Sequence, residues 1–237
     1  MEPLVSVIIP TFNGQKYIGE TLESVLAQTY RSLEVIVVDD GSSDRTADVV
    51  RAFAPDVHLI GQRHAGHPAA RNCGVRAAAG EFLGFLDHDD LWAPGKIAAQ
   101  LQCFRNESTL DLVFGHIQNF FSPEMSEDER RRVTAPMDAL PGQLQGAMLA
   151  KRSSFDRVGP FSEQRSMGDF LDWYGRAMIQ NLKVHMQSQV VMHRRIHAAN
   201  YQRTHGHLRK QYLSALKQLL DRRRSAIAEE RRRRGWT

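Results

Sequence analysis

Apolar stretches of strand length alternate with amphipathic stretches through the first half of this chain of 237 residues. The apolar runs, which have the composition of buried strands, occupy residues 5–9, 33–38, 57–60, 82–86 and 112–117. Apolar residues at helical spacing fill the intervals, at residues 17–26, 44–53, 69–79 and 94–106. This alternation predicts an α/β fold with a parallel sheet that is covered by helices on both faces.

Residues that start or stop regular structure lie at the ends of these stretches. Pro10 is expected to stop the first strand, because proline cannot donate to a sheet ladder. Ser43 or Asp44 can cap the second helix. Pro68 can start the third helix, and Gly80 can end it.

The second half of the chain is less regular. Residues 122–132 are charged and polar, and we expect them to form a mobile loop. The elements expected after it are a short apolar segment at 146–150, a helix at 170–181 and a strand at 190–196. The residues expected to anchor the core here are Phe155, Val158 and Phe161.

The C-terminal residues combine a basic charge with a helical apolar stripe. Residues 205–237 contain ten Lys or Arg and three Asp or Glu, whereas residues 1–204 contain 21 and 24. The stripe runs through Leu208, Tyr212, Leu213, Leu216, Leu219, Leu220 and Ile227. We therefore expect a folded domain at 1–204 and a basic amphipathic helix at 205–237. The stripe must be buried against the domain, against a second subunit in a dimer, or against a membrane surface as a peripheral contact.

Composition excludes several classes of protein. The 42% apolar and 24% charged content is ordinary for a globular protein, and no apolar run reaches the length of a membrane span. Cys73 and Cys103 provide neither a disulfide framework nor a cysteine-based zinc site. Because the N-terminus has no signal-peptide pattern, we expect a cytoplasmic protein, and we expect no nucleic-acid partner.

Three carboxylates follow the fourth apolar run within four positions. Asp87, Asp89 and Asp90 come directly after residues 82–86, so a strand would hold them at its C-terminal edge, where open α/β sheets bind ligands. Neighbouring carboxylates repel each other unless a cation lies between them. Their oxygens suit Mg²⁺ or Mn²⁺, which in turn bind diphosphates. The alternative interpretation is an acidic turn that caps the following helix.

Four segments in this order resemble the family 2 glycosyltransferases, which have the A-type, nucleotide-diphospho-sugar transferase fold. They are residues 5–13 (VSVIIPTFN), 37–44 (VVDDGSSD), 70–74 (ARNCG) and 86–92 (LDHDDLW), the last resembling the D-x-D box of the family. The second half matches more loosely, through residues 146–148, 159–161, 168–173 and 195–197. The resemblance implies a Rossmann-like, mostly parallel sheet with a nucleotide-binding half at 1–105 and an acceptor-side half at 106–204.

The resemblance implies a nucleotide site made of Pro10, Thr11, Phe12, Asn13, Asp39, Asp40, Arg71, Asp87 and His88. Phe12 can stack on a nucleobase, or it can pack under the first helix as a hydrophobic staple. A carboxylate after the second strand can accept the imide N–H of uracil or thymine, and the resemblance points to Asp40 rather than Asp39 for this contact. Turn formation is the alternative for both. Arg71 can pair with Asp87 or Asp40, or it can be a solvated helix residue.

The resemblance also implies a divalent metal, Mn²⁺ or Mg²⁺, with Asp89 and His197 as ligands. Asp87 is expected to face the ribose or a metal-bound water, and His197 has the diphosphate as its alternative partner. The intervening His88 is interpreted as incidental, although it lies within the motif. Two further histidines are interpreted as polar loop residues, namely His64 and His67.

Asp169 is the candidate catalytic base by resemblance. The family usually has Glu-Asp at this point, whereas this chain has Gly168 and Asp169. The local alternatives are that Asp169 caps the following helix and that Asp172 stabilises its first turn or pairs with Arg176 at i+4.

Together these features predict an inverting glycosyltransferase that uses a nucleoside-diphosphate sugar, with a UDP-sugar favoured and a dTDP-sugar second. A sugar, a lipid-linked sugar, a peptide and a small metabolite remain open as acceptors. A sugar nucleotidyltransferase is less favoured because no glycine-rich basic loop follows the first strand, and a dinucleotide-binding enzyme because G-x-G-x-x-G is missing there. The non-enzyme alternative, an inactive carbohydrate-binding relative or scaffold, is disfavoured by the intact Asp87, Asp89 and Asp169.

Overall fold

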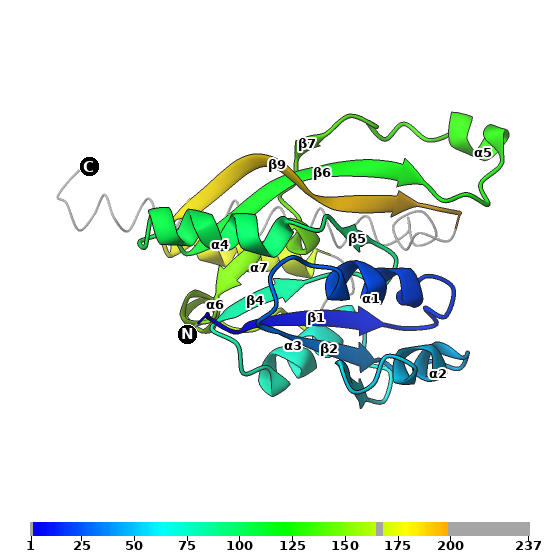
Figure 1. The fold of residues 1–237 in the computed structure, drawn as a ribbon, viewed down its shortest axis with the longest axis horizontal. Helices are drawn as coiled ribbons and strands as arrows, with labels where there is room; N and C mark the ends of the chain where they lie inside the picture. The colour runs from blue at the N-terminus through cyan, green and yellow to red at the C-terminus, as the bar shows by residue number, and fades with distance from the viewer. Residues whose placement is uncertain (1, 165–167, 199–237) are drawn as a thin grey trace.

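The computed structural model describes residues 2–164 and 168–198, and in that part of the chain nine strands form one sheet between two layers of helices (Figure 1). The strands are β1 (Val5–Thr11), β2 (Leu33–Asp39), β3 (Val57–Gly61), β4 (Phe82–Phe85), β5 (Leu91–Trp92), β6 (Leu112–Phe121), β7 (Leu140–Pro141), β8 (Leu149–Lys151) and β9 (Val184–Ile196). The helices are α1 (Ile18–Leu26), α2 (Thr46–Arg51), α3 (His67–Ala77), α4 (Lys96–Asn106), α5 (Glu127–Arg131), α6 (Arg152–Val158) and α7 (Asp169–Ile179), with a 3₁₀ turn η1 at Gln145–Ala147. The helix expected at 205–237 lies outside the described residues.

The strand order is β3-β2-β1-β4-β8-β6-β9-β5, with β7 paired to β6. The strands β3, β2, β1 and β4 are mutually parallel, and β6 and β9 form a second long parallel ladder. The short strand β8 joins the two groups because it is antiparallel to both β4 and β6. The expected α/β class with a mostly parallel sheet is confirmed, and a single sheet runs through both halves of the chain.

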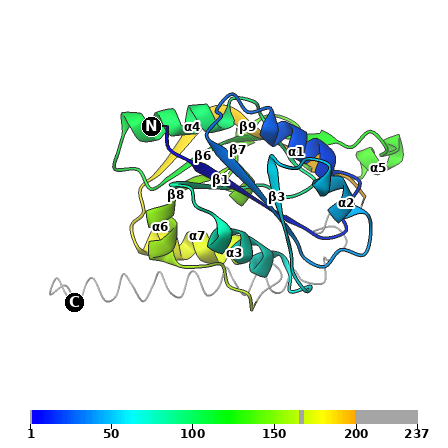
Figure 2. The same ribbon diagram turned by 60° about the horizontal axis from the view of Figure 1, so that its bottom comes forward.

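Alternating residues of β1 build the cores on the two faces of the sheet. Val7 and Ile9 pack with apolar residues of α1, α2 and α4, whereas Ile8 packs with residues of α3, α6 and α7. Figure 2 shows α1 and α4 on one side of the sheet and α3, α6 and α7 on the other. Because helices pack on both faces of the sheet, the polar residues of the expected site lie at the carboxyl ends of the strands instead. The expected anchors Phe155, Val158 and Phe161 are all buried.

Pro10 lies inside β1, so the prediction that it stops the strand is wrong. Ile8 accepts a bond from the chain after β4, whereas Thr11 accepts one from the β2 side. Pro10 shares the orientation of Ile8, and β4 has already ended beside it. The missing N–H of the proline therefore costs no ladder bond, and the pairing with β2 continues to Thr11.

The stretch expected as a loop at residues 122–132 contains the helix α5. Ser126 Oγ accepts from the Glu129 backbone N–H at 3.3 Å, and the Ser126 N–H donates to Glu129 Oε2 at 2.8 Å. This reciprocal capping box satisfies donors that the start of a helix would otherwise leave without partners. The Ser-x-x-Glu motif of this capping box is present in the sequence, but the high charge of residues 122–132 led to the prediction of a loop.

Other boundaries shift through contacts between distant segments. Helix α3 ends at Ala77 instead of residue 79, because Glu34 Oε1 accepts bonds from the N–H groups of Ala79 and Gly80. The strands β6 and β9 are longer than expected because their outer residues pair with each other. The N-cap of α2 is Arg45, which makes no side-chain cap bond, so the prediction of Ser43 or Asp44 is wrong. Asp44 precedes the N-cap, and its Oδ1 still accepts from the Thr46 N–H at 2.9 Å. None of the described helices is of a length and apolarity that would let it cross a bilayer.

Candidate active site

The expected site residues gather where β1, β2, β4 and β9 end. Thr11 and Asp39 are neighbours in the β1–β2 ladder, and the acidic turn that contains Asp87 and Asp89 begins two residues after β4. His197 follows the last residue of β9. Because parallel strands present their carboxyl ends at one edge, residues from both halves of the chain reach a common site.

Phe12 is an exposed aromatic residue at this edge. Its side chain is 37% exposed, and its ring lies 4.3 Å from the ring of His64. The staple interpretation is therefore wrong, because a staple would bury Phe12 under α1. A flat aromatic surface open to solvent can take a nucleobase by stacking.

The two acids after β2 have different environments. The buried carboxylate of Asp40 accepts bonds from the Gln62 side chain at 2.7 Å and from the N–H groups of Ala65 and Gly66 at 2.8 Å. His64 Nδ1 lies 2.9 Å from the same carboxylate. Asp40 thus organises the loop before α3, and its oxygens are already occupied.

Asp39 keeps one carboxylate oxygen for a ligand. Its Oδ1 accepts from the Ser42 N–H at 2.9 Å, which is the expected turn contact, and its Oδ2 has no hydrogen-bond partner within residues 2–164 and 168–198. The geometry favours Asp39 for a nucleobase contact, whereas the resemblance pointed to Asp40.

The loop after β1 is tightly packed between its neighbours. Asn13 accepts from the Ser43 N–H at 2.8 Å and so ties this loop to the loop after β2. A Cβ on Gly14 would lie 2.5 Å from Thr11 Oγ1 and 2.7 Å from the His88 ring, so only glycine fits there. His88 therefore packs under the loop, which is a structural role for a residue interpreted as incidental.

Arg71 joins the two halves of the site. Its side chain is 5% exposed, and it donates to Asp87 Oδ1 at 2.8 Å and to Asp169 Oδ2 at 2.6 Å. The expected pairing with Asp87 is confirmed, and the solvated alternative is wrong. Burial alone would raise the pKa of Asp87, but the guanidinium of Arg71 and the nearby His67 outweigh it and lower that pKa to about 2.

Asp169 and Asp172 are separated by their partners. Asp169 is the first residue of α7 and points to Arg71, and the preceding Gly168 has a positive φ of 79°. Asp169 is therefore not the N-cap, and its Oδ1 has no hydrogen-bond partner in the described part of the chain. Asp172 accepts from Arg176 at 3.0 Å, as the i+4 alternative predicted.

Asp89 and His197 face each other across the same edge. His197 Nε2 lies 3.0 Å from Asp89 Oδ2. Within the described ranges, no group of three or more His, Cys, Asp and Glu side chains could hold a metal ion. One carboxylate and one imidazole fit a divalent ion that takes its remaining ligands from diphosphate oxygens and water, as Mg²⁺ commonly does. Asp90 points inward and is buried, and its pKa is raised by burial and by the charges of Asp89 and Asp87.

Sequence reasoning missed two glutamines at the site. Gln62 holds Asp40, and Gln145, from η1, donates to Asp87 Oδ2 at 3.1 Å. Neither lies in a local motif. Only the neighbouring Gly146 and Ala147, which belong to a loosely matching segment, marked the region of Gln145.

Comparisons with known proteins agree with this geometry. The family profile described as glycosyl transferase family 2 matches residues 6–162. An uncharacterized glycosyltransferase of Rickettsia prowazekii is 28% identical in an alignment of 209 residues that covers 83% of this chain and 65% of that protein. One of Nostoc sp. is 30% identical in an alignment of 213 residues that covers 83% of this chain and 66% of that protein. The chain spans less than two thirds of the length of these two curated relatives.

Two solved structures share the arrangement of strands and helices. S. aureus TarS 1-349 in complex with UDP-GlcNAc superposes with a TM-score of 0.69 at 20% identity, covering 92% of this chain and 66% of that one. The mannosyltransferase PcManGT from Pyrobaculum calidifontis, in complex with GDP-Man and Mn²⁺, gives 0.64 at 23% identity, covering 97% and 75%. At these identities the likeness establishes the fold.

Proposed function

This chain belongs to glycosyl transferase family 2, and we propose that it transfers a sugar, with inversion, from a nucleoside-diphosphate sugar to an acceptor hydroxyl. The family and the A-type glycosyltransferase fold expected from the sequence are confirmed. The observation that carries the proposed activity is the position of Arg71, which binds Asp87 from the nucleotide half and Asp169 from the acceptor half. Arg71 thus connects the proposed sugar-nucleotide site, through Asp87, to Asp169, whose carboxylate can accept a proton from the acceptor.

The donor would lie across the ends of β1 and β2. The exposed ring of Phe12 offers stacking to the base, and Asp39 Oδ2 can accept the imide N–H of a pyrimidine. A UDP-sugar is therefore the proposed donor, and UDP-GlcNAc in TarS gives an example on the same fold. Asp87 would face the ribose, from a position fixed by Arg71 and Gln145.

Asp89 and His197 would hold the divalent ion. When bound there, Mn²⁺ or Mg²⁺ offsets the negative charge on the departing diphosphate. The mannosyltransferase PcManGT, which was solved with Mn²⁺, supports this assignment by fold. Asp89 and His197 come from opposite halves of the chain, so the ion would be held where the two halves meet.

Asp169 is the proposed general base. Arg71 fixes one of its oxygens, and Oδ1 remains to accept the proton of the acceptor hydroxyl. Asp172 is a poorer candidate, because Arg176 occupies its carboxylate at 3.0 Å. A base on the acceptor side, apart from the metal residues, is what direct displacement with inversion requires.

Nucleotide binding and turnover test the proposal together. We would screen UDP-, dTDP- and GDP-sugars by thermal shift with and without Mn²⁺, and then follow the release of nucleoside diphosphate from any sugar that binds. Mn²⁺-dependent release supports a glycosyltransferase. Release of pyrophosphate from a nucleoside triphosphate and a sugar phosphate would favour the nucleotidyltransferase. Binding without any turnover, with water or a panel of acceptors, would favour the inactive scaffold.

A further inference from the structure

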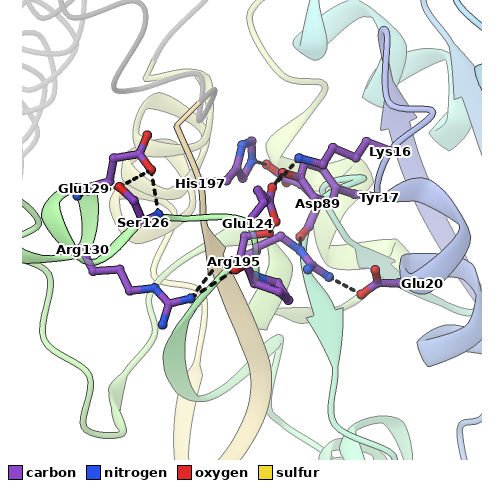
Figure 3. A network of polar contacts seen from close by, with 12 residues as sticks. Lys16, Tyr17, Glu20, Asp89, Glu124, Ser126, Glu129, Arg130, Arg195 and His197 are labelled. Carbon is purple, nitrogen blue, oxygen red and sulfur yellow. Dashed lines mark hydrogen bonds and ion pairs between the residues drawn. The ribbon is translucent and has the colours of Figure 1, made fainter.

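Arg195 is a buried arginine beside the proposed metal residues, and nothing in the proposed chemistry uses it. It lies in β9, two positions before His197, and is 2% exposed. Figure 3 shows its guanidinium between Glu20 and the residues of the metal site. A buried cation near a proposed cation site would repel the ion, so the position of Arg195 calls for a compensating function.

The first contacts of Arg195 are with the turn that presents Asp89. Arg195 Nε donates to the Asp89 carbonyl at 3.0 Å, and its backbone N–H donates to Asp90 Oδ1 at 2.9 Å. One residue therefore binds two consecutive members of the turn, through its side chain and its backbone. Any shift of this turn would break both bonds.

The rest of the turn is bound by a residue of α1. Thr21 Oγ1, on α1, lies 2.8 Å from the His88 carbonyl and 2.9 Å from the Asp90 carbonyl. The Asp90 N–H donates to the Asp87 carbonyl at 3.1 Å. With Arg195 added, the carbonyls of Asp87 and Asp89 each accept a hydrogen bond, and the single hydroxyl hydrogen of Thr21 is shared between the carbonyls of His88 and Asp90. The backbone that carries the Asp89 carboxylate is therefore restrained on both sides of residue 89.

Arg195 is itself fixed by three other groups. Its guanidinium lies 4.9 Å from the ring centre of Tyr17 and 4.8 Å from that of Phe120, and it donates to Glu20 Oε2 at 2.6 Å. The Tyr17 ring also lies 4.7 Å from the ring of His197. The same packing thus orients both proposed metal residues.

We infer that Arg195 is a positioning residue that sets the carboxylate of Asp89 and the imidazole of His197 for a divalent cation. The inference rests on the proposed function, because it assumes that these two residues bind the cation. Groups that hold metal ligands in place commonly change metal affinity about 10–100-fold when they are removed. Simple charge repulsion predicts the opposite sign, since loss of a nearby positive charge would tighten cation binding.

The test is a titration of each purified protein with Mn²⁺ at a fixed concentration of UDP, in which electron paramagnetic resonance measures the free ion and a titration of UDP without protein gives the background. We expect Arg195→Gln to weaken Mn²⁺ binding about tenfold. Arg195→Lys should weaken it less, because lysine keeps the charge and its stem but cannot reach Asp89 and Glu20 together. Arg152→Gln is the matched control, because Arg152 donates to the carbonyls of Gly80, Val75 and Ala78, none of which belongs to the metal turn.

The outcomes separate this inference from the proposed function. Weaker Mn²⁺ binding in Asp89→Ala and Arg195→Gln, with wild-type binding in Arg152→Gln, supports both. If Asp89→Ala weakens binding while Arg195→Gln binds equally or more tightly, the positioning role is overturned and the metal site stands. If Asp89→Ala binds like the wild type, the metal assignment fails and the inference fails with it. An equal loss in Arg152→Gln, or failure of both Arg195 variants to fold by circular dichroism, would show a general structural role and overturn the inference.

Discussion

Arg71 donates to Asp169 across 2.6 Å, although the two residues lie 98 positions apart in the chain. The same guanidinium binds Asp87 at 2.8 Å. A change at either carboxylate therefore alters the environment of the other. This coupling makes Asp87, Arg71 and Asp169 a unit that links the proposed donor site to the proposed base.

Asp169→Asn should lower sugar transfer about 10²–10⁴-fold, because the amide cannot accept the acceptor proton as a carboxylate does. Affinity for the donor nucleotide should change far less than transfer, since Phe12 and Asp39 are untouched and Asp87 keeps its bonds from Arg71 and Gln145. Transfer is measured by product formation, and the anomeric configuration of the product by NMR. Asp172→Asn is the control, and it should affect stability more than transfer because it breaks the pair with Arg176. Near-wild-type transfer by Asp169→Asn, or a product that retains the donor configuration, would disprove the assignment.

Asp39→Asn and Asp40→Asn should have different effects. Asp39→Asn should weaken nucleotide binding about tenfold through loss of a charge-assisted hydrogen bond, with little change in stability. Asp40→Asn should lower the free energy of unfolding by about 1–3 kcal/mol, because a buried donor of the 62–66 loop loses its acceptor. Isothermal titration with UDP and denaturant unfolding measure the two effects. If instead Asp40→Asn weakens UDP binding and Asp39→Asn lowers stability, Asp40 is the residue that contacts the nucleobase.

Asp89→Ala should abolish the effect of Mn²⁺ on nucleotide binding while the protein remains folded. The expectation follows from the pairing of Asp89 with His197 and the absence of a larger ligand cluster among the described residues. Titration of UDP with Mn²⁺ and with EDTA measures it, and circular dichroism checks the fold. Wild-type protein that binds UDP equally tightly in EDTA would refute the metal assignment.

Lys96 should make stability depend on alkaline pH. Burial lowers its pKa well below the ordinary value of 10.5, so between the two pKa values the unfolded chain holds a proton that the folded chain has lost. The free energy of unfolding should therefore rise with pH across this window. Lys96→Met should flatten the rise, because methionine keeps the stem and removes the titrating group. Urea unfolding at several pH values measures both slopes, and parallel slopes would contradict the assignment.

The sequence alone predicted the site residues that directly follow a strand. Asp39, Asp87 and Asp89 each follow an apolar run, and an apolar run followed by acids needs no distant contact to be recognised. The boundary at Pro10 was not predictable in this way, because it depends on where a neighbouring strand stops. The length of β9 likewise depends on its pairing with β6.

The partners of these acids could not be read from the sequence. Gln145 reaches Asp87 from 58 positions away, and the four donors around Asp40 come from a loop whose shape only the fold defines. The sequence does not show whether the carboxylate of an aspartate already accepts hydrogen bonds within the protein or is available to a ligand. The choice between Asp39 and Asp40 therefore required the positions of their neighbours.

The pairing of β5 with β9 determines when the site can form during synthesis. Leu91 pairs with His193, and Arg195 binds the carbonyl of Asp89, which lies 106 positions earlier in the chain and is synthesised first. Contacts between such distant residues form slowly, because the chain between them must first lose its conformational freedom. A nascent chain that has emerged only as far as residue 162, where the family match ends, contains Asp89 but lacks the strand that fixes it. The proposed cation site is thus complete only when β9 and the His197 that follows it have been made.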